Sequence, residues 1–222
     1  MDTTIRRKRR AALAALLSGT LAATAAGLAG AATPPGQPVI VVLGDSLSAE
    51  YGLPRDTGWV SLLRQRLATE RIDYSVANAS VSGDTTSGGR ARLPAVLERL
   101  KPAIVVVELG SNDALRGVPL ATTERNLREI VADAQRARAK VVLVGMYVPP
   151  NYGPDYTQKF HGIYTKLSKD LRVPLVPFLL AGIENRPEMF QADQIHPTQQ
   201  AQGALLDNVW PSLRPLLAKP RG

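Results

Sequence analysis

The sequence predicts an α/β protein with a doubly wound parallel sheet. Five short apolar runs alternate with segments of helical periodicity along the 222 residues, an order typical of strands joined by crossover helices. Polar clusters follow several of these runs, and sites in such folds form outside the carboxyl ends of the strands. We find no internal repeat, so we expect one domain after an N-terminal leader.

The expected strands are short runs rich in apolar residues. Residues 38–43 (PVIVVL) are apolar throughout, as in a parallel strand covered on both faces, and we place them centrally in the sheet. Alternation of the runs with helices favours a parallel sheet. The five expected strands are residues 38–43, 74–77, 103–109, 140–148 and 173–178.

The expected helices carry apolar residues three and four positions apart, as Leu93 and Leu97 illustrate. Thr122 or Thr123 can cap the third helix. Pro211 is expected to bend or interrupt the last one. The five expected helices are residues 59–69, 90–100, about 123–138, 155–171 and 197–217.

An N-terminal leader precedes the domain. Five of the first ten residues are Lys or Arg, and residues 11–32 contain no charged side chain. This pattern is typical of a secretory signal peptide, with cleavage expected near residues 31–33. A retained membrane anchor is the alternative, although the Ala and Gly content makes the run only weakly hydrophobic. We expect residues 1–32 to be a cleaved signal peptide and residues 33–222 to be a periplasmic or secreted domain.

Composition excludes several classes of function. The chain has no cysteine, which excludes disulfides, a cysteine nucleophile and thiolate metal sites, and its two histidines disfavour a histidine-rich metal site. Outside the first ten residues, 22 basic side chains face 18 acidic ones, and the basic residues are scattered. Nucleic-acid binding requires a basic patch. We therefore expect no metal, no cofactor and no nucleic-acid partner.

Polar clusters follow three expected strands and precede the last helix. They are residues 44–48 (GDSLS), 78–85 (NASVSGDT), 110–113 (GSND) and 193–197 (DQIHP). Ser46 lies where the first strand ends, and a serine there can act as a nucleophile if a base lies nearby. Capping of a turn or helix is the alternative role of Ser46.

His196 is the better of two candidate bases. His161 lies within an expected helix, whereas His196 lies in a loop three residues after Asp193. A carboxylate at this spacing can reach the imidazole, fix its tautomer and stabilise the imidazolium that forms when the histidine takes a proton. The alternatives are a solvated loop charge at Asp193 and a helix-start residue at His196.

Acyl transfer also needs donors for a developing oxyanion. The backbone amides of Ser46 and Gly83 and the side-chain amide of Asn112 could supply three. Gly83 could instead provide a turn with positive φ, and Asn112 a turn or cap.

These blocks resemble those of the SGNH (GDSL-motif) hydrolases in content, order and spacing. The similarity is strongest to the bacterial thioesterase I, protease I and lysophospholipase subgroup and its arylesterase relatives, and it covers essentially the whole mature chain. The residues that carry it are 44–49, 91–94, 107–110, 112–113, 115–117 and 151–153. The resemblance implies a flavodoxin-like three-layer α/β/α sandwich with a five-stranded parallel sheet. It also implies a nucleophile at Ser46, a base at His196 oriented by Asp193, and an oxyanion hole formed by Ser46, Gly83 and Asn112.

The resemblance further implies a serine esterase that hydrolyses carboxylic esters or thioesters through an acyl-enzyme, without a cofactor. Expected substrates are small acyl esters or thioesters, membrane-derived lipids among them, and we expect a monomer. A carbohydrate O-acetyl esterase and a non-catalytic lipid-binding protein are the alternatives. Plain surface connection is the alternative role of the loop that follows the third block. The expected substrate contacts are Leu115, Arg116, Gly117, Val118, Pro119 and Tyr147.

Three positions depart from the pattern of the subgroup. Glu50 and Ser111 stand where it usually has Gly, and Gln194 replaces a frequent Gly between Asp193 and His196. None of these changes removes a catalytic group. We expect the charge of Glu50, close to the nucleophile, to disfavour anionic substrates.

Overall fold

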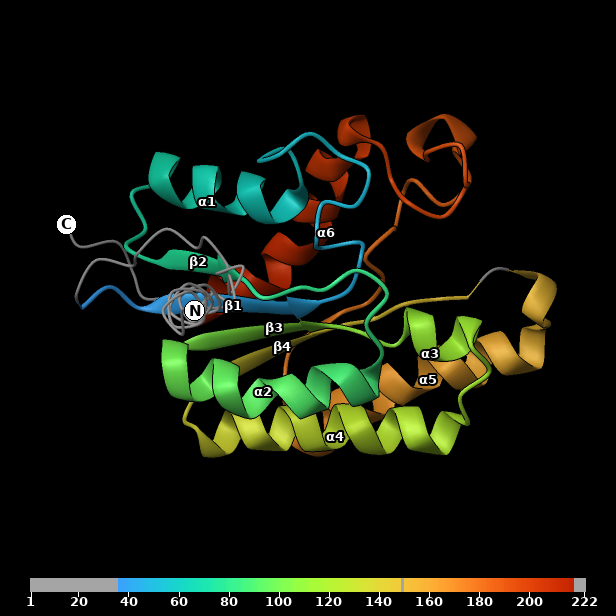
Figure 1. The fold of residues 1–222 in the computed structure, drawn as a ribbon, viewed down its shortest axis with the longest axis horizontal. Helices are drawn as coiled ribbons and strands as arrows, with labels where there is room; N and C mark the ends of the chain where they lie inside the picture. Colours follow the sequence, from blue (N-terminus) through green and yellow to red (C-terminus); the bar gives the residue numbers. More distant parts are fainter. Residues whose placement is uncertain (1–35, 149, 218–222) are drawn as a thin grey trace, which may run out of the picture. The chain divides into compact units, whose positions relative to one another are not determined.

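A five-stranded parallel sheet is the frame of the described residues, which are 36–148 and 150–217 of this computed structural model. The expected leader, residues 1–32, lies outside them. The strand order is β2-β1-β3-β4-β5, so the chain changes direction across the sheet at β1 (Figure 1). The strands are β1 (Val39–Gly44), β2 (Ser75–Asn78), β3 (Ile104–Glu108), β4 (Lys140–Val144) and β5 (Leu175–Val176).

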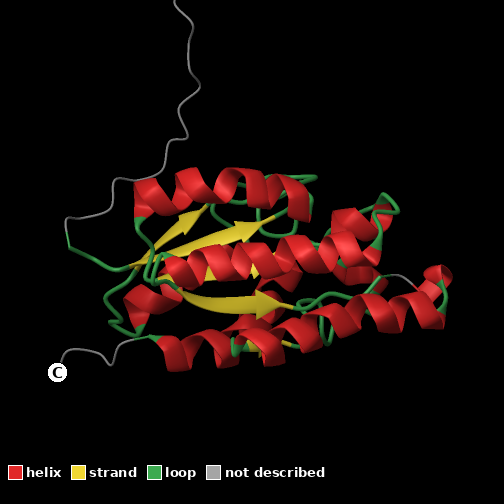
Figure 2. Ribbon diagram, turned by 90° about the horizontal axis from the view of Figure 1, so that it is seen from below, coloured by secondary structure: helices red, strands yellow, loops and turns green. Residues whose placement is uncertain are grey.

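Helices cover both faces of the sheet. On one face α1 (Trp59–Thr69) packs against α6 (Gln202–Leu213). On the other, α4 (Leu120–Arg136) lies between α2 (Thr86–Leu100) and α5 (Pro154–Leu171), and Figure 2 views the molecule from the side of these helices. The expected three-layer α/β/α sandwich is confirmed.

The central strand β1 is buried along its whole length, as its sequence predicts. Ile40 and Val42 belong to the larger core cluster, whereas Val39 and Val41 pack with Val96 of α2 in a second cluster. Alternate residues of a strand point to opposite faces. Because both faces are covered by helices, both sets of residues must be apolar.

Two helices begin earlier than expected. Thr85 caps α2, its side chain accepting a hydrogen bond from a backbone N–H of the first turn, so the helix starts at Thr86. The polar, glycine-rich start of α2 has no apolar periodicity that could reveal this. α4 follows directly on Pro119, so the predicted cap at Thr122 or Thr123 was wrong.

The carboxyl side of the sheet is less regular than expected. β4 ends at Val144, and β5 has only two residues. A short helix that the sequence did not predict, α3 (Ser111–Leu115), follows β3. α6 begins at Gln202 after a 3-10 turn and continues through Pro211, which therefore does not interrupt it.

Candidate active site

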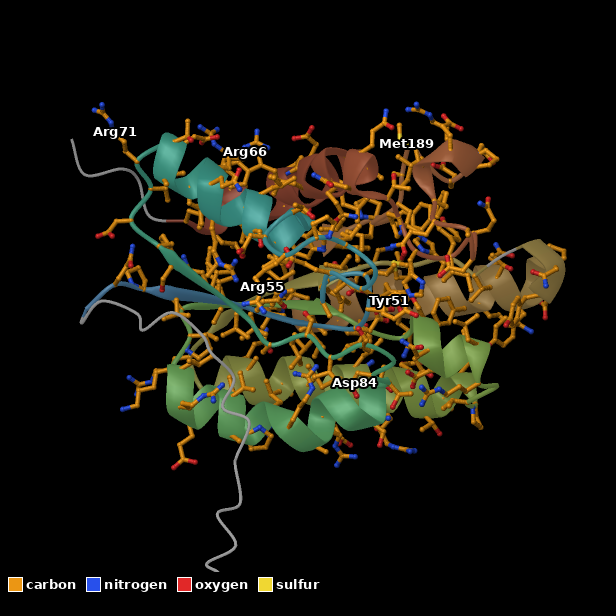
Figure 3. All side chains as sticks on the ribbon, turned by 45° about the horizontal axis from the view of Figure 1, so that its top comes forward. Tyr51, Arg55, Arg66, Arg71, Asp84 and Met189 are labelled. Carbon is orange, nitrogen blue, oxygen red and sulfur yellow. The ribbon has the colours of Figure 1, made fainter. Side chains whose placement is uncertain are left out.

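The carboxyl ends of the strands bring the polar clusters of the sequence together. Ser46 follows β1, Asn112 lies in α3 after β3, and His196 comes from the loop before α6. All three line one open cleft of about 1620 Å³. Figure 3 labels Tyr51 and Asp84, which come from the loops after β1 and β2 at this end of the molecule.

Ser46, His196 and Asp193 form a hydrogen-bonded series. His196 Nε2 lies 2.9 Å from Ser46 Oγ, and His196 Nδ1 lies 2.7 Å from Asp193 Oδ2. Since the carboxylate can only accept, Nδ1 carries the proton, and Nε2 is left to accept the hydroxyl proton of Ser46. This is the geometry of a nucleophile with its base and the group that orients the base.

Local turns fix Asp193 in this position. Its Oδ1 accepts backbone hydrogen bonds from Ile195 and His196, at 2.9 and 3.0 Å. Donation by the backbone of His196, then by its ring, and then by the backbone of Ile195 lowers the pKa of Asp193 to about 2. Asp193 therefore stays ionised at any pH at which the neutral imidazole could act as a base.

A buried acid supports the turn that carries Ser46. Glu108, the last residue of β3, is fully buried, and its Oε2 accepts hydrogen bonds from Asp45 N at 3.3 Å and Ser48 Oγ at 2.7 Å. A Cβ on Gly44 would lie 2.7 Å from the same oxygen. Gly44 is therefore required by the close approach of this acid rather than by its backbone angles.

Asp45 and Glu108 are two buried carboxyl groups close to each other. Burial raises the pKa of Asp45 to about 6, although hydrogen bonds from Leu47 and Asn112 and the charge of His196 lower it. Burial, and then the charge of Asp45, raises the pKa of Glu108 well above its usual value. Asp45 is therefore ionised at neutral pH, while the raised pKa of Glu108 makes protonation of that group easier.

Asn112 is held next to the nucleophile by α3. Gly110 precedes this helix and has a φ of 123°, a backbone conformation that favours glycine. A side chain at this position would also collide with Tyr164 Oη. Tyr164 in turn donates to Leu109 O at 2.9 Å. Asn112 Nδ2 donates to Asp45 Oδ2 at 3.0 Å.

Gly83 lies in a turn with φ of 79°, at the edge of this group rather than in the cleft lining. Within residues 36–148 and 150–217, the backbone amides of Ser46 and Gly83 donate to no protein acceptor. Arg92 ties the Gly83 turn to the end of β1, since it pairs with Asp84 at 2.7 Å and donates to Gly44 O at 3.2 Å.

Two residues that we did not single out join the histidine loop to the nucleophile loop. Gln191 Nε2 donates to Tyr51 O at 2.9 Å and to Pro197 O at 3.2 Å. The ring of Tyr51 lies against that of His196, with 4.4 Å between centroids. Gln191 carries no sequence signal, and Tyr51 could have been found only through its closeness to Ser46.

One wall of the cleft is formed by α5. α5 is 18 residues long and lines the cleft over several turns. Lining residues that lie about one turn apart are Gln158, Gly162, Thr165 and Lys169. His161 also lines it, stacked at 3.8 Å on Tyr147.

The apolar part of the lining includes two of the expected substrate contacts, Leu115 and Tyr147. The other four expected contacts, residues 116–119, lie outside the lining. Arg116 instead donates to Gly83 O at 2.7 Å.

Glu50 serves the loop around it. Its carboxylate accepts hydrogen bonds from Gly58 N at 2.8 Å, Ser61 Oγ at 2.8 Å and Asp56 N at 3.0 Å. Partial burial opposes ionisation, but these hydrogen bonds, led by that of Ser61, lower the pKa of Glu50. Glu50 does not line the cleft, and its effect on anionic substrates stays a prediction.

The described part of the chain holds neither a candidate metal cluster nor a candidate membrane span. No three His, Cys, Asp or Glu side chains gather there in a way that could hold a metal ion. No helix there is both long and apolar enough to cross a bilayer.

A serine, a histidine and an aspartate in hydrogen-bonded series at the carboxyl edge of a parallel sheet are the arrangement of a serine hydrolase. The model of the GDSL-like Lipase/Acylhydrolase family matches residues 42–204. The chain belongs to this family, the SGNH hydrolases, and the resemblance inferred from the four sequence blocks is confirmed.

The relatives of the chain are esterases and thioesterases by name. It is 51% identical over 178 residues to "Esterase TesA" of Pseudomonas aeruginosa, covering 80% of this chain and 89% of the relative. It is 42% identical over 178 residues to "Thioesterase 1/protease 1/lysophospholipase L1" of Escherichia coli K12, covering 80% and 84%. It is 43% identical over 163 residues to an "Arylesterase" of Vibrio mimicus, covering 73% and 82%.

Solved structures confirm the fold. The crystal structure of TesA has a TM-score of 0.79 at 51% identity, with 82% of this chain and 100% of that one covered. The esterase EstA from Pseudoalteromonas, in a structure inhibited by monoethylphosphonate, has a TM-score of 0.77 at 39% identity, with 81% and 98% covered.

Proposed function

We propose that the protein is an exported serine esterase that hydrolyses carboxylic ester or thioester bonds through an acyl-enzyme on Ser46. The observation that carries this proposal is the hydrogen-bonded series of Ser46, His196 and Asp193, with separations of 2.9 and 2.7 Å. The named activities of the relatives support the same reaction class. Export rests on the leader in residues 1–32.

The proposed reaction has two halves. Ser46 Oγ attacks the substrate carbonyl while His196 Nε2 takes the hydroxyl proton, and His196 then passes this proton to the leaving alcohol or thiol. Water then gives a proton to His196 and attacks the acyl carbonyl; the bond to Ser46 Oγ breaks, the acid leaves, and His196 returns the proton to Ser46 Oγ. Asp193 keeps the imidazole in the tautomer that both halves need.

Negative charge develops on the carbonyl oxygen in each half. We assign its stabilisation to the backbone amides of Ser46 and Gly83 and to the side-chain amide of Asn112. Neither backbone amide is engaged by an acceptor in the described residues. Donors that are already oriented need no reorganisation when the charge appears, which is why such sites lower the barrier strongly.

The cleft favours a substrate with an extended apolar part. Ligand pockets commonly enclose about 300–1,000 Å³, and this open cleft, at about 1620 Å³, is larger. Leu115, Tyr147 and Phe178 are among its apolar lining residues. We therefore propose fatty esters, fatty acyl thioesters or lysophospholipids as substrates, with the acyl chain lying against these apolar lining residues.

The first test is hydrolysis of p-nitrophenyl esters from acetate to palmitate by the chain without residues 1–32. Ser46→Ala should lose essentially all activity, and a fluorophosphonate probe should label the wild type but not the variant. The proposed chain-length preference predicts faster turnover of the longer esters. Equal activity in Ser46→Ala would refute the acyl-enzyme. No activity on any ester, with acetate release from acetylated glycans, would favour the carbohydrate esterase instead.

A further inference from the structure

Asn112 can serve as an oxyanion donor only if its amide group is held in one orientation. An asparagine side chain can rotate by half a turn and present its carbonyl oxygen instead of its N–H groups. Asp45 Oδ2 accepts from Asn112 Nδ2 at 3.0 Å. A carboxylate cannot face an amide oxygen without repulsion, so ionised Asp45 allows only the orientation that turns the NH₂ group toward it.

This contact leaves one N–H of Asn112 for a ligand. Asn112 lines the cleft beside Ser46, and Asp45 is its only hydrogen-bond acceptor within the described part of the chain. The two N–H bonds of an amide lie in one plane at a fixed angle. Fixing one of them on Asp45 therefore sets the direction of the other.

The same carboxylate also holds the nucleophile's turn. Asp45 Oδ1 accepts from Leu47 N at 3.0 Å, on the far side of Ser46 in the chain. One side chain thus joins the turn after β1 to the helix after β3. The spacing between Ser46 and the amide of Asn112 depends on it.

Asp45 has little freedom to move. Only 1% of its surface is exposed, and its backbone N–H donates to Glu108 Oε2, which also accepts from Ser48 Oγ. Trp59 Nε1 donates to Ser48 Oγ at 3.2 Å and extends the support to α1.

We infer that Asp45 is the positioning residue of the oxyanion hole, acting through Asn112 by orienting its amide toward the substrate carbonyl. The inference rests on the proposed function and adds to it a residue that touches no reacting atom. Neutralising Asp45 should therefore slow the reaction without weakening substrate binding. The effect of Asp45→Asn on turnover should vanish once the amide of Asn112 is gone, because an asparagine at position 45 keeps an oxygen that can accept from Leu47 N.

The test is a double-mutant cycle with Asp45→Asn and Asn112→Ala, assayed on p-nitrophenyl butyrate. Asp45→Asn should lower kcat by about 10–100-fold, somewhat less than loss of an oxyanion donor, with little change in KM. The double variant should be no slower than Asn112→Ala alone. If the two losses multiply, or if Asp45→Asn keeps full kcat, the inference is overturned.

Asp84→Asn is the matched control. Asp84 is a less buried acid near the site, and its side chain pairs with Arg92 and does not contact Asn112. When Asp84→Asn is combined with Asn112→Ala, the fold-loss in kcat of the double variant should equal the product of the two single losses. An equally non-additive control would show general disorder of the site and overturn the specific role of Asp45.

A pH profile tests the inference without changing Asp45, in case Asp45→Asn does not fold. Protonation of Asp45 should release the amide of Asn112, so kcat/KM of the wild type should fall on the acid side with an ionisation that belongs to Asp45. The groups that face Asp45 are Glu108, Asp84, His196 and Tyr164. Asn112→Ala should lose the ionisation of Asp45 from its pH profile. The same acid limb in both proteins would overturn the inference.

The proposed function and the inference fail in different ways. Full activity of Ser46→Ala would refute the acyl-enzyme and remove the basis of both. Loss of activity in Ser46→Ala, together with an additive cycle, would leave the esterase intact and overturn only the role of Asp45.

Discussion

The two halves of the site are built in opposite ways. The sheet half comprises Asp45, Ser46 and Asn112, which stand at the ends of β1 and β3 above the buried Glu108. The loop half comprises Asp193 and His196, held by turns before α6. Each half contains an aspartate that must be ionised to act, yet burial raises the pKa of Asp45 to about 6, whereas local hydrogen bonds lower the pKa of Asp193 to about 2.

The difference shows what each half gains from its surroundings. Asp45 is almost fully buried, so packing fixes its position. The same burial raises its pKa and makes its carboxylate easier to protonate. Asp193 keeps 39% of its side chain exposed and is fixed by hydrogen bonds within four residues. Orientation is therefore supplied by the core in one half and by local backbone in the other.

The largest expected effect comes from the loop half. Asp193→Asn should lower kcat by about 10⁴-fold, because the amide favours the wrong tautomer of His196. The free energy of unfolding should fall only slightly, because solvent screens the charge of the exposed Asp193 and an amide oxygen can still accept from the backbone of Ile195 and His196. Steady-state kinetics and urea denaturation of the same samples check both points. A variant that unfolds, or one that keeps its kcat, would contradict the division between the two halves.

The next effect comes from crowding in the sheet half. Gly44→Ala places a Cβ 2.7 Å from Glu108 Oε2 and 2.8 Å from Ser48 Oγ, and should cost about 3 kcal/mol of stability together with most of the activity. Gly182→Ala is the matched change in the loop half, where no atom lies within 4 Å but φ is 83°. It should cost about 1 kcal/mol of strain and leave kcat unchanged.

Thermal unfolding and ester hydrolysis of the two glycine variants would decide this comparison. Equal losses of activity would mean that the sheet half is no more tightly packed around the nucleophile than the loop. Retained activity in Gly44→Ala would show that Glu108 can move away from the turn.

The contributions of the two aspartates to the free energy of unfolding should change with pH in opposite directions. The folded-state pKa of Asp45 is raised from 3.8 to about 6, so the stability that its protonated form contributes is fully present below about pH 4 and is lost as pH rises through about 6, by about 3 kcal/mol. The folded-state pKa of Asp193 is lowered to about 2, so its contribution is present above about pH 4 and is lost as pH falls toward 2.

Urea denaturation over this pH range separates the two contributions. Asp45→Asn should flatten the decline between about pH 4 and 6, and Asp193→Asn should leave it in place. Burial also raises the pKa of Glu108, so any decline that Glu108 causes remains in both variants. A decline that persists unchanged in Asp45→Asn would show that Asp45 is not its source.

The smallest effect is expected from Gln191, which joins the two halves. Gln191→Ala removes the hydrogen bonds to Tyr51 O and Pro197 O, and should lower kcat by about tenfold, the weight of one or two hydrogen bonds. Gln194→Ala is its control, because the side chain of Gln194 donates only within its own loop, to Gln191 O. Equal losses in the two variants would contradict a specific link through Gln191.

The fold could be predicted largely from sequence because its core is encoded in continuous apolar runs. β1 and β3 are buried on every residue, and their runs are unmistakable. The caps could not be predicted as well, since Thr85, Pro119 and Thr122 are all acceptable near a helix start and tertiary packing decides among them.

The polar blocks of the site were visible in the sequence, but the contacts between them were not. Ser46, Asn112 and His196 were found because each lies in a polar block after or before a clear element. The link from Asn112 to Asp45 spans 67 positions in the chain and has no local pattern. Glu108 left one signal, a charged residue within an otherwise apolar strand, which indicates a buried acid in need of partners.

The wall that α5 contributes to the cleft presents side chains at regular intervals along the length of the cleft. Positions on the same side of a helix recur about every 5.4 Å, and Gln158, Gly162, Thr165 and Lys169 mark successive intervals along the cleft. Gly162 is the one position of this series without a side chain, and a Cβ placed there would meet no atom within 4 Å. A bulky residue at Gly162 would divide the cleft into a short and a long compartment. Under the proposed function, we expect the accepted acyl length to be adjustable at this single position, away from Ser46, His196 and Asn112.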